Sequence, residues 1–275
     1  MRGRTALTVP NWVSYDEVAD PYERYHVRKG YALLARDLVL AMELPYAATV
    51  LDVGTGTGEA ALIALALSAR SVIVGIDPSR PMLHLAAKKG LRLLVAGETP
   101  GLPFPAGRFD AVMATLVLSH FKNYQEALVD MVRVLKTRGR LGVTAWAARS
   151  SRHARAADVW RRAAESFVGG EALRSASDYI APWENWFTEP EHIASALMGA
   201  GLKEVRIERR DYRVSITAAE YLSRMESSGW GRCMRGTLDQ SRWADFQRNV
   251  ADRFTSSLPR RFTITPSAHL ATAIK

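Results

Sequence analysis

The 275-residue sequence predicts an α/β fold built on a doubly wound parallel sheet. From Thr49 onward, short apolar runs alternate with longer helical segments, the pattern of parallel strands joined by crossover helices. A glycine-rich turn follows the first apolar run, and an acidic residue ends the second. Such crossovers are right-handed, and ligands of these sheets bind beyond the carboxyl ends of the strands. We therefore expect the functional site at that edge.

The individual elements follow from local patterns. A helical stretch over 28–43 is closed by Pro45 as a stop signal. Strands are expected at 49–53, 71–76, 92–95, 109–114 and 139–145, and helices at 59–69, 80–89 and 123–135. After residue 146, an Arg-, Ala- and Ser-rich helical stretch leads to an aromatic segment, 179–187, which we interpret as an insertion. A helix over 191–200, a strand over 203–210, a helical excursion over 218–255 and a closing strand over 262–274 complete the chain.

The decisive motif joins the first strand to a glycine-rich turn. Within residues 50–59 (VLDVGTGTGE), the glycines Gly54, Gly56 and Gly58 let the backbone turn tightly and approach a ligand closely. The second strand ends at Asp77, where a carboxylate can bind both ribose hydroxyls of an adenosine. A dinucleotide site is the natural rival, but its G-x-G-x-x-G spacing requires glycine where this chain has Glu59. A glutamate there would also repel a pyrophosphate at the helix N-terminus.

Residues 49–146 resemble the class I, Rossmann-like S-adenosylmethionine-dependent methyltransferases. They resemble especially the small-molecule group that includes the ubiquinone/menaquinone C-methyltransferases. It rests on the glycine loop at 52–58 (DVGTGTG), on 97–105 (GETPGLPFP) followed by 109–112 (FDAV), and on 133–136 (RVLK). Glu98 stands where the family usually has Asp, and Thr137-Arg138 replaces its usual Pro-Gly. These matches occur in the family's order over about a hundred residues.

The resemblance implies the fold, the domain organisation and the cofactor. It implies a seven-stranded, mostly parallel sheet whose last strand, near 269–274, runs antiparallel, with S-adenosyl-L-methionine as cofactor and S-adenosyl-L-homocysteine as product. We expect an N-terminal helical lid at 1–48 and an S-adenosylmethionine-binding core at 49–146. We then expect an inserted helical and aromatic cap at 147–188. The rest of the core sheet is expected at 189–275, with a second helical cap at 218–255.

The resemblance also implies roles for single residues. Asp52 and the glycine loop would hold the methionine end, Asp77 the ribose, and Glu98 with the Thr99 amide the adenine. Met82 would pack on the adenine face. The expected cofactor-binding residues are Tyr15, Tyr22, Asp52, Gly54, Thr55, Gly56, Gly58, Asp77, Pro78, Met82, Gly97, Glu98, Thr99, Thr115 and Leu116.

Aromatic residues outside the core are candidates for closing the site and for binding the methyl acceptor. Tyr15 and Tyr22, with Tyr25 nearby, resemble the Y-x-x-x-A-x-x-Y lid of related methyltransferases; a hydrophobic staple for the N-terminus is the alternative. The expected substrate-pocket residues are Tyr25, Trp183, Trp186 and Trp230, because acceptor pockets are mostly apolar. Ordinary packing within the caps explains the tryptophans equally well.

His120 follows the fourth strand and is the candidate catalytic base, needed if the acceptor is a hydroxyl or an enolisable carbon. The alternative is a structural histidine that bonds a backbone carbonyl. His26 and His192 lie outside the core and are interpreted as surface or cap residues. The single cysteine, Cys233, supports neither a disulfide nor a metal site, so no metal is expected.

The chain is therefore predicted to methylate carbon or oxygen of a hydrophobic or aromatic small molecule in the cytoplasm. The net charge of +9 comes from 30 Arg and 7 Lys spread over the chain, without a nucleic-acid-binding motif, so no nucleic-acid partner is expected. No apolar run approaches the ~18 residues of a membrane span, and no signal-peptide core follows Met1, so no stable membrane insertion is expected. An RNA or protein methyltransferase and a non-catalytic cofactor-binding protein remain alternatives, and a homo-oligomer is left open.

Overall fold

The computed structural model describes residues 15–148 and 154–275. The first part of the predicted lid and residues 149–153 of the first predicted cap lie outside the described residues. Seven strands form one sheet in the order β3-β2-β1-β4-β5-β9-β6. The strands are β1 (Thr49–Val53), β2 (Val72–Asp77), β3 (Leu93–Ala96), β4 (Phe109–Thr115), β5 (Leu135–Trp146), β6 (Lys203–Asp211) and β9 (Ser267–Ile274). β9 runs antiparallel to both of its neighbours, β5 and β6, whereas the other pairs of neighbouring strands are parallel, which confirms the predicted fold class.

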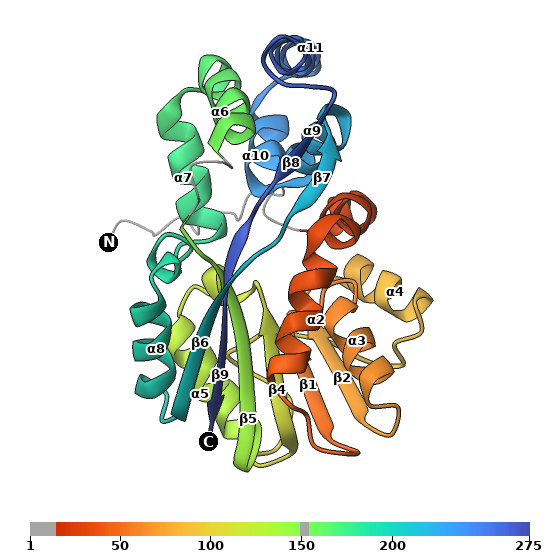
Figure 1. Ribbon diagram of the computed structural model, residues 1–275, viewed down its shortest axis with the longest axis vertical. Coiled ribbons are helices and arrows are strands. Elements are labelled where there is room, and N and C mark those ends of the chain that lie inside the picture. The colour runs from red at the N-terminus through yellow and green to blue at the C-terminus, as the bar shows by residue number, and fades with distance from the viewer. Residues whose placement is uncertain (1–14, 149–153) are drawn as a thin grey trace, which may run out of the picture.

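Helices cover both faces of the sheet (Figure 1). The helices α5 (Tyr124–Val134) and α8 (Pro190–Gly199) pack on one face, and α2 (Ala32–Ala41), α3 (Glu59–Leu67) and α4 (Arg80–Lys88) on the other. Because both faces are covered, the central strands are apolar almost throughout, and β4 is buried along most of its length. The carboxyl ends of the parallel strands face the upper half of the molecule in Figure 1.

The upper half is a second body, which we call the cap and define as residues 154–180 and 214–264. It contains α6 (Ala154–Val168), α7 (Gly170–Ile180), α9 (Ala218–Ser227), α10 (Gly229–Thr237) and α11 (Gln240–Ser257). Trp160 is fully buried, stacks on Trp230 and meets Phe246 edge-on, so both predicted cap segments share one hydrophobic core. Their packing makes one structural unit from two distant stretches of sequence.

The chain passes twice between the sheet and the cap, each time through two strands that follow one another in sequence (Figure 1). The prediction missed β7 (Val214–Thr217), which pairs with β8 (Arg261–Ile264) in a separate two-stranded sheet. The closing strand predicted over 262–274 is in fact divided into β8 and β9. Pro266 lies between the two, and a proline has no backbone N–H to give to a sheet.

The described N-terminal segment lies between the sheet and the cap. It consists of the short turns η2 (Asp16–Val18) and α1 (Ala19–Tyr22), then a π-helical stretch, η3 (Glu23–Tyr31), that continues into α2. The single helix predicted over 28–43 is therefore shorter, and its first residues belong to the π-helical stretch. We call residues 15–31 the lid because they contact α4 and α9.

Candidate active site

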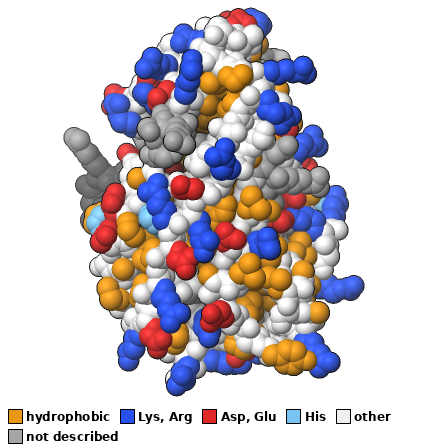
Figure 2. Space-filling model, viewed as in Figure 1, with side chains coloured by type: hydrophobic (Ala, Val, Ile, Leu, Met, Phe, Trp, Pro, Cys, Tyr) orange, Lys and Arg blue, Asp and Glu red, His pale blue; other side chains and the backbone are white. Residues whose placement is uncertain are grey.

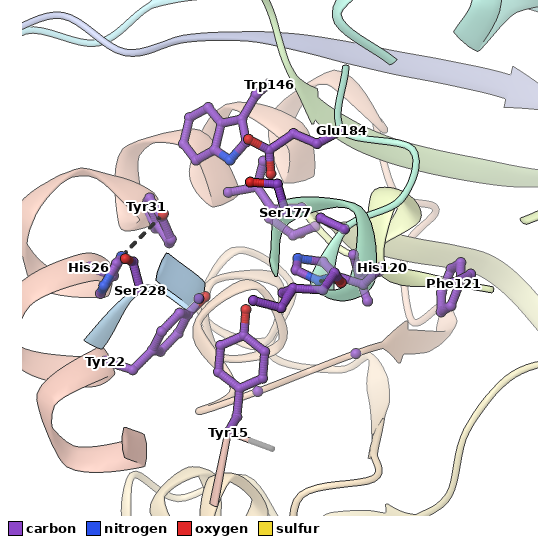
Figure 3. A pocket seen from close by; sticks show the side chains of 18 of the residues that line it. Tyr15, Tyr22, His26, Tyr31, His120, Phe121, Trp146, Ser177, Glu184 and Ser228 are labelled. Carbon is purple, nitrogen blue, oxygen red and sulfur yellow. Dashed lines mark hydrogen bonds between the residues drawn. The ribbon is translucent and has the colours of Figure 1, made fainter. Parts of the chain in front are cut away.

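A cavity of about 1210 Å³ lies where the carboxyl edge of the sheet, the lid and the cap meet. Figure 3 shows side chains from all three around it. Of the predicted site residues, Tyr15, Tyr22, Gly54, Gly56, Asp77, Pro78, Met82, Gly97, Glu98, Thr99, Thr115, Leu116, His120 and Trp230 line this cavity. The fold thus brings most of the expected cofactor residues and the candidate base to one cavity.

The glycine loop after β1 is tied to the end of β2 through one carboxylate. The Gly56 N–H donates to Asp77 Oδ2 over 2.9 Å, and the Ser79 N–H donates to Asp77 Oδ1 over 2.8 Å. Burial raises the pKa of Asp77, while these two backbone donors oppose the rise. Gly56 has a φ of 52°, and a Cβ at this position would meet nothing within 4 Å, so the loop leaves room beside Asp77.

Two buried polar atoms beside the loop have no hydrogen-bond partner among the described residues. They are Asp52 Oδ1 and Thr115 Oγ1. The other oxygen of Asp52 accepts a hydrogen bond from the Thr55 hydroxyl over 2.7 Å, and burial raises the pKa of Asp52 to about 7. An unsatisfied buried carboxylate oxygen is costly unless a ligand supplies a donor. The ammonium group of S-adenosylmethionine is a donor of this kind, so these residues fit that cofactor.

The lid is fastened on both sides of the glycine loop. The Thr57 hydroxyl donates to Glu23 Oε2 over 2.5 Å, and Lys89 Nζ contacts both Glu23 and Glu59 at 2.9–3.0 Å. Farther along, the Ser79 hydroxyl donates to Asp16 Oδ1 over 2.6 Å. These polar contacts hold the lid over the loop that would bind the cofactor.

Aromatic rings from the lid continue into the cavity wall (Figure 3). The Tyr22 ring stacks on His26 at 5.0 Å and meets Tyr15 edge-on at 5.7 Å, and Tyr31 lies 5.3 Å from Trp146 between ring centroids. Burial raises the pKa of Tyr22 well above its ordinary value, so this phenol is neutral near pH 7. The wall combines apolar ring faces with hydroxyl groups that can hydrogen-bond.

His120 lies at the end of the short turn η4 (Leu118–His120) and faces the same cavity (Figure 3). Its Nδ1 lies 2.9 Å from the backbone oxygen of Ile180. A carbonyl only accepts, so Nδ1 carries the proton in the neutral ring and Nε2 has a free lone pair. Burial, followed by the charge of Arg232, lowers the pKa of His120. His120 therefore makes the backbone-carbonyl contact that the structural alternative predicts, and it also keeps the unprotonated Nε2 that a base requires.

Several predicted site residues do not line the cavity. Asp52, Thr55 and Gly58 lie behind the loop that does, and Tyr25 lies in the lid outside the cavity wall. Trp183 packs edge-on against Tyr124 at 4.8 Å between ring centroids. Trp186, in η6 (Trp186–Thr188), stacks on His192 at 3.4 Å and is 44% exposed. The structure places these two tryptophans away from the cavity, because the chain after α7 runs down beside α5 and α8.

Other residues of the cavity wall were missed. They include His26, Tyr31, Trp146, Glu184 and Arg224. The interpretation of His26 as a surface or cap residue is wrong, because its side chain is only 5% exposed and lines the cavity. The signal was present in the sequence, since His26 follows Tyr22 by four residues and helical spacing of that kind puts both on one face.

Comparison with known proteins identifies the kind of domain that contains this site. A family model described as a methyltransferase domain matches residues 51–143. The core of this chain is a class I methyltransferase domain. S-Adenosylmethionine is the cofactor of this class, and the residues around Asp52 and Asp77 fit it.

The methyltransferase domain is similar to curated relatives over different lengths. Demethylmenaquinone methyltransferase of Thermus thermophilus is 38% identical over 99 residues, which cover 34% of this chain and 45% of the relative. Nocamycin O-methyltransferase of Saccharothrix syringae is 28% identical over 226 residues, which cover 76% of this chain and 78% of that protein. The chain thus matches less than half the length of the Thermus relative.

Solved methyltransferases share the fold of the whole chain. A SAM-dependent methyltransferase from Thermotoga maritima has a TM-score of 0.55 at 17% identity, with 96% of this chain and 99% of that chain covered. Within residues 15–148 and 154–275, no helix is long and apolar enough to cross a membrane. The same residues contain no group of three or more His, Cys, Asp or Glu side chains able to hold a metal ion.

Proposed function

We propose that this protein transfers the methyl group of S-adenosylmethionine to a carbon or oxygen atom of a hydrophobic or aromatic small molecule, with S-adenosylhomocysteine as the second product. The observation that carries the proposal is the single cavity in which Asp77, the aromatic wall and His120 meet. The demethylmenaquinone and nocamycin methyltransferases described above are named for methyl transfer to small molecules, which supports this substrate class.

The proposed roles of the residues follow from their positions. When bound, S-adenosylmethionine supplies a methyl group that is already electrophilic, so the protein mainly aligns the reactants and excludes water. Asp77 would accept from the ribose hydroxyls and Glu98 from the adenine amino group, because both line the cavity. Asp52 lies behind the glycine loop, where its unpartnered Oδ1 would accept from the ammonium group at the methionine end. The lid covers the glycine loop and limits access of water.

His120 would remove the acceptor's proton. Its Nε2 lone pair is available near pH 7 because Nδ1 donates to the Ile180 carbonyl and burial disfavours the charged ring. An acceptor hydroxyl or an acidic carbon near Nε2 would lose its proton to this nitrogen as the new bond forms. Tyr15, whose ring centroid lies 6.1 Å from that of His120, would form the adjoining wall.

We also propose that the acceptor is neither a nucleic acid nor a protein. On the face in Figure 2, Lys and Arg side chains are scattered and interspersed with Asp and Glu rather than gathered into one basic patch. A small-molecule acceptor bound in a cavity requires no such surface. We also propose a cytoplasmic location, supported by the presence of a single cysteine, Cys233, in the whole sequence.

The direct test combines binding and turnover. Calorimetry should detect S-adenosylhomocysteine binding to the full chain. A screen of phenols, quinones and prenylated compounds with deuterium-labelled methyl donor should yield a methylated product by mass spectrometry. Failure to bind S-adenosylhomocysteine would overturn the proposal. Binding without transfer to any acceptor in the screen would favour the non-catalytic alternative.

A further inference from the structure

Arg224 brings a positive charge from the cap into the cavity wall. It lies on α9 of the cap, lines the cavity and forms no ion pair with any residue that the structure describes. Its Nη1 is buried and has no hydrogen-bond acceptor there either. A guanidinium keeps its charge at any physiological pH, so a partly buried one without an anion is costly until a ligand supplies the counter-charge.

Two side chains of the lid hold Arg224 in place. Burial lowers the pKa of His26 well below its ordinary value, so the ring is neutral and donates from only one nitrogen. Its Nε2 lies 3.0 Å from both the backbone oxygen of Arg224 and the Ser227 hydroxyl. The carbonyl can only accept, whereas the hydroxyl can accept as well as donate, so Nε2 is the donor. Nδ1 must then accept from the Tyr31 hydroxyl at 3.2 Å, the contact dashed in Figure 3. The Arg224 guanidinium lies over the Tyr31 ring at 5.1 Å, so the lid fixes both its backbone and its head group.

Charges of both signs face this corner of the cavity. A second cation, Arg232, lies 4.1 Å above the Tyr15 ring, and both guanidinium charges add to burial in lowering the pKa of His26. The carboxylates of Glu184 and Asp178 also line the cavity, and burial together with Glu184 raises the pKa of Tyr31. The Nη1 of Arg224 has no acceptor among the described residues, so an anionic ligand would complete its contacts.

We propose that the methyl acceptor is a small aromatic or hydrophobic anion, a carboxylate, enolate or phenolate, whose negative oxygen is bound by Arg224. His26 and Tyr31 act as positioning residues for this guanidinium. The inference rests on the proposed function and deepens it, because it assigns a charge to the acceptor of the same cavity. It also gives the lid a second role, since the segment that covers the cofactor site orients the group that selects the acceptor.

The test uses the full chain saturated with S-adenosylhomocysteine and two probes of equal shape, 1-naphthoate and 1-naphthamide. Quenching of tryptophan fluorescence reports their binding, because Trp146 and Trp230 line the cavity, and calorimetry gives the affinities. We expect naphthoate to bind at least tenfold more tightly than naphthamide. R224M should weaken naphthoate at least tenfold and naphthamide less than twofold, whereas R224K should keep part of the preference.

The controls separate this inference from folding and from the proposed function. R235M removes an exposed arginine of α10 and should leave both probes unchanged. Y31F keeps the ring but removes the hydroxyl that donates a hydrogen bond to His26. It should reduce the preference for naphthoate about three- to fivefold and leave the affinity for naphthamide unchanged. Equal affinities of the two probes, binding of neither, or an unchanged preference in R224M would overturn the inference while S-adenosylhomocysteine still binds. Loss of S-adenosylhomocysteine binding by the wild type would instead overturn the proposed function.

Discussion

Gly56 donates its backbone N–H to Asp77 across 2.9 Å, so the turn after β1 and the end of β2 are held together by one carboxylate. The second oxygen of Asp77 holds the Ser79 N–H at the start of α4. Asp77 therefore organises the edge of the sheet before any ligand is bound. Its substitution should affect both the shape of this edge and what binds there.

Asp77→Ala should weaken S-adenosylhomocysteine binding at least tenfold, about 1.4 kcal/mol, measured by calorimetry. It should also lower the free energy of unfolding by about 1–3 kcal/mol, because two backbone donors lose their acceptor. Asp252→Ala, an exposed change on α11, is the matched control and should alter neither quantity. An affinity within twofold of the wild type would contradict the assignment of Asp77 to the cofactor.

Asp52→Asn should stabilise the free protein at alkaline pH while weakening the binding of S-adenosylmethionine. The pKa of Asp52 in the folded state, about 7, lies above the ordinary 3.8, so folding takes up a proton. This contribution to stability is complete below about pH 4 and is lost as pH rises through 7. The gain in the variant should therefore grow between pH 5 and pH 8, to at most about 4 kcal/mol.

The check on Asp52 is chemical denaturation of the free protein at both pH values. Thr55 can still donate to an asparagine oxygen, so the substitution leaves that contact available. Parallel pH curves for variant and wild type would show that the carboxyl does not take up the proton.

His120→Gln should lower kcat by about 100-fold or more if Nε2 accepts the proton of the acceptor. Because burial lowers the pKa of His120 from 6.5, the wild-type rate should be constant near pH 7 and fall only at pH values below about 6.5. The variant should lack that acidic decline. His192→Gln removes a histidine stacked on Trp186 outside the cavity and serves as the control. A wild-type rate in His120→Gln would leave this residue a purely structural role.

Lys89→Met should open the lid. Lys89 connects Glu23 of the lid with Glu59 of α3, and its removal leaves two partly buried carboxylates near one another. We expect S-adenosylhomocysteine to dissociate about three- to tenfold faster in stopped-flow measurements. The neighbouring Lys88→Met removes an exposed charge and should dissociate at the wild-type rate. Equal rates for the two variants would mean that this ion pair does not hold the lid.

The sequence was most informative where chemistry and chain order coincide. The glycine loop, Asp77 and the 97–105 segment each follow a strand directly, and strands of a parallel sheet end at one edge, so their convergence could be predicted. His120 reached the same cavity for the same reason, since it follows β4 closely.

Contacts between distant segments were not predictable in this way. His26 forms a hydrogen bond with the backbone oxygen of Arg224, and no local sequence pattern predicts that contact. Trp186 and Trp230 look alike in composition, yet one stacks on His192 at the surface and the other lines the cavity. The short strand β7 was missed because four residues carry too weak a pattern, and its pairing with β8 depends on tertiary structure.

The core of the cap is assembled from both of its segments, with Trp160 of one packed between Trp230 and Phe246 of the other. Neither segment alone can bury its apolar face. Exchange of only one of them between related enzymes should therefore expose hydrophobic surface and cause aggregation rather than a new selectivity. A change of acceptor preference should therefore require that both cap segments be exchanged together.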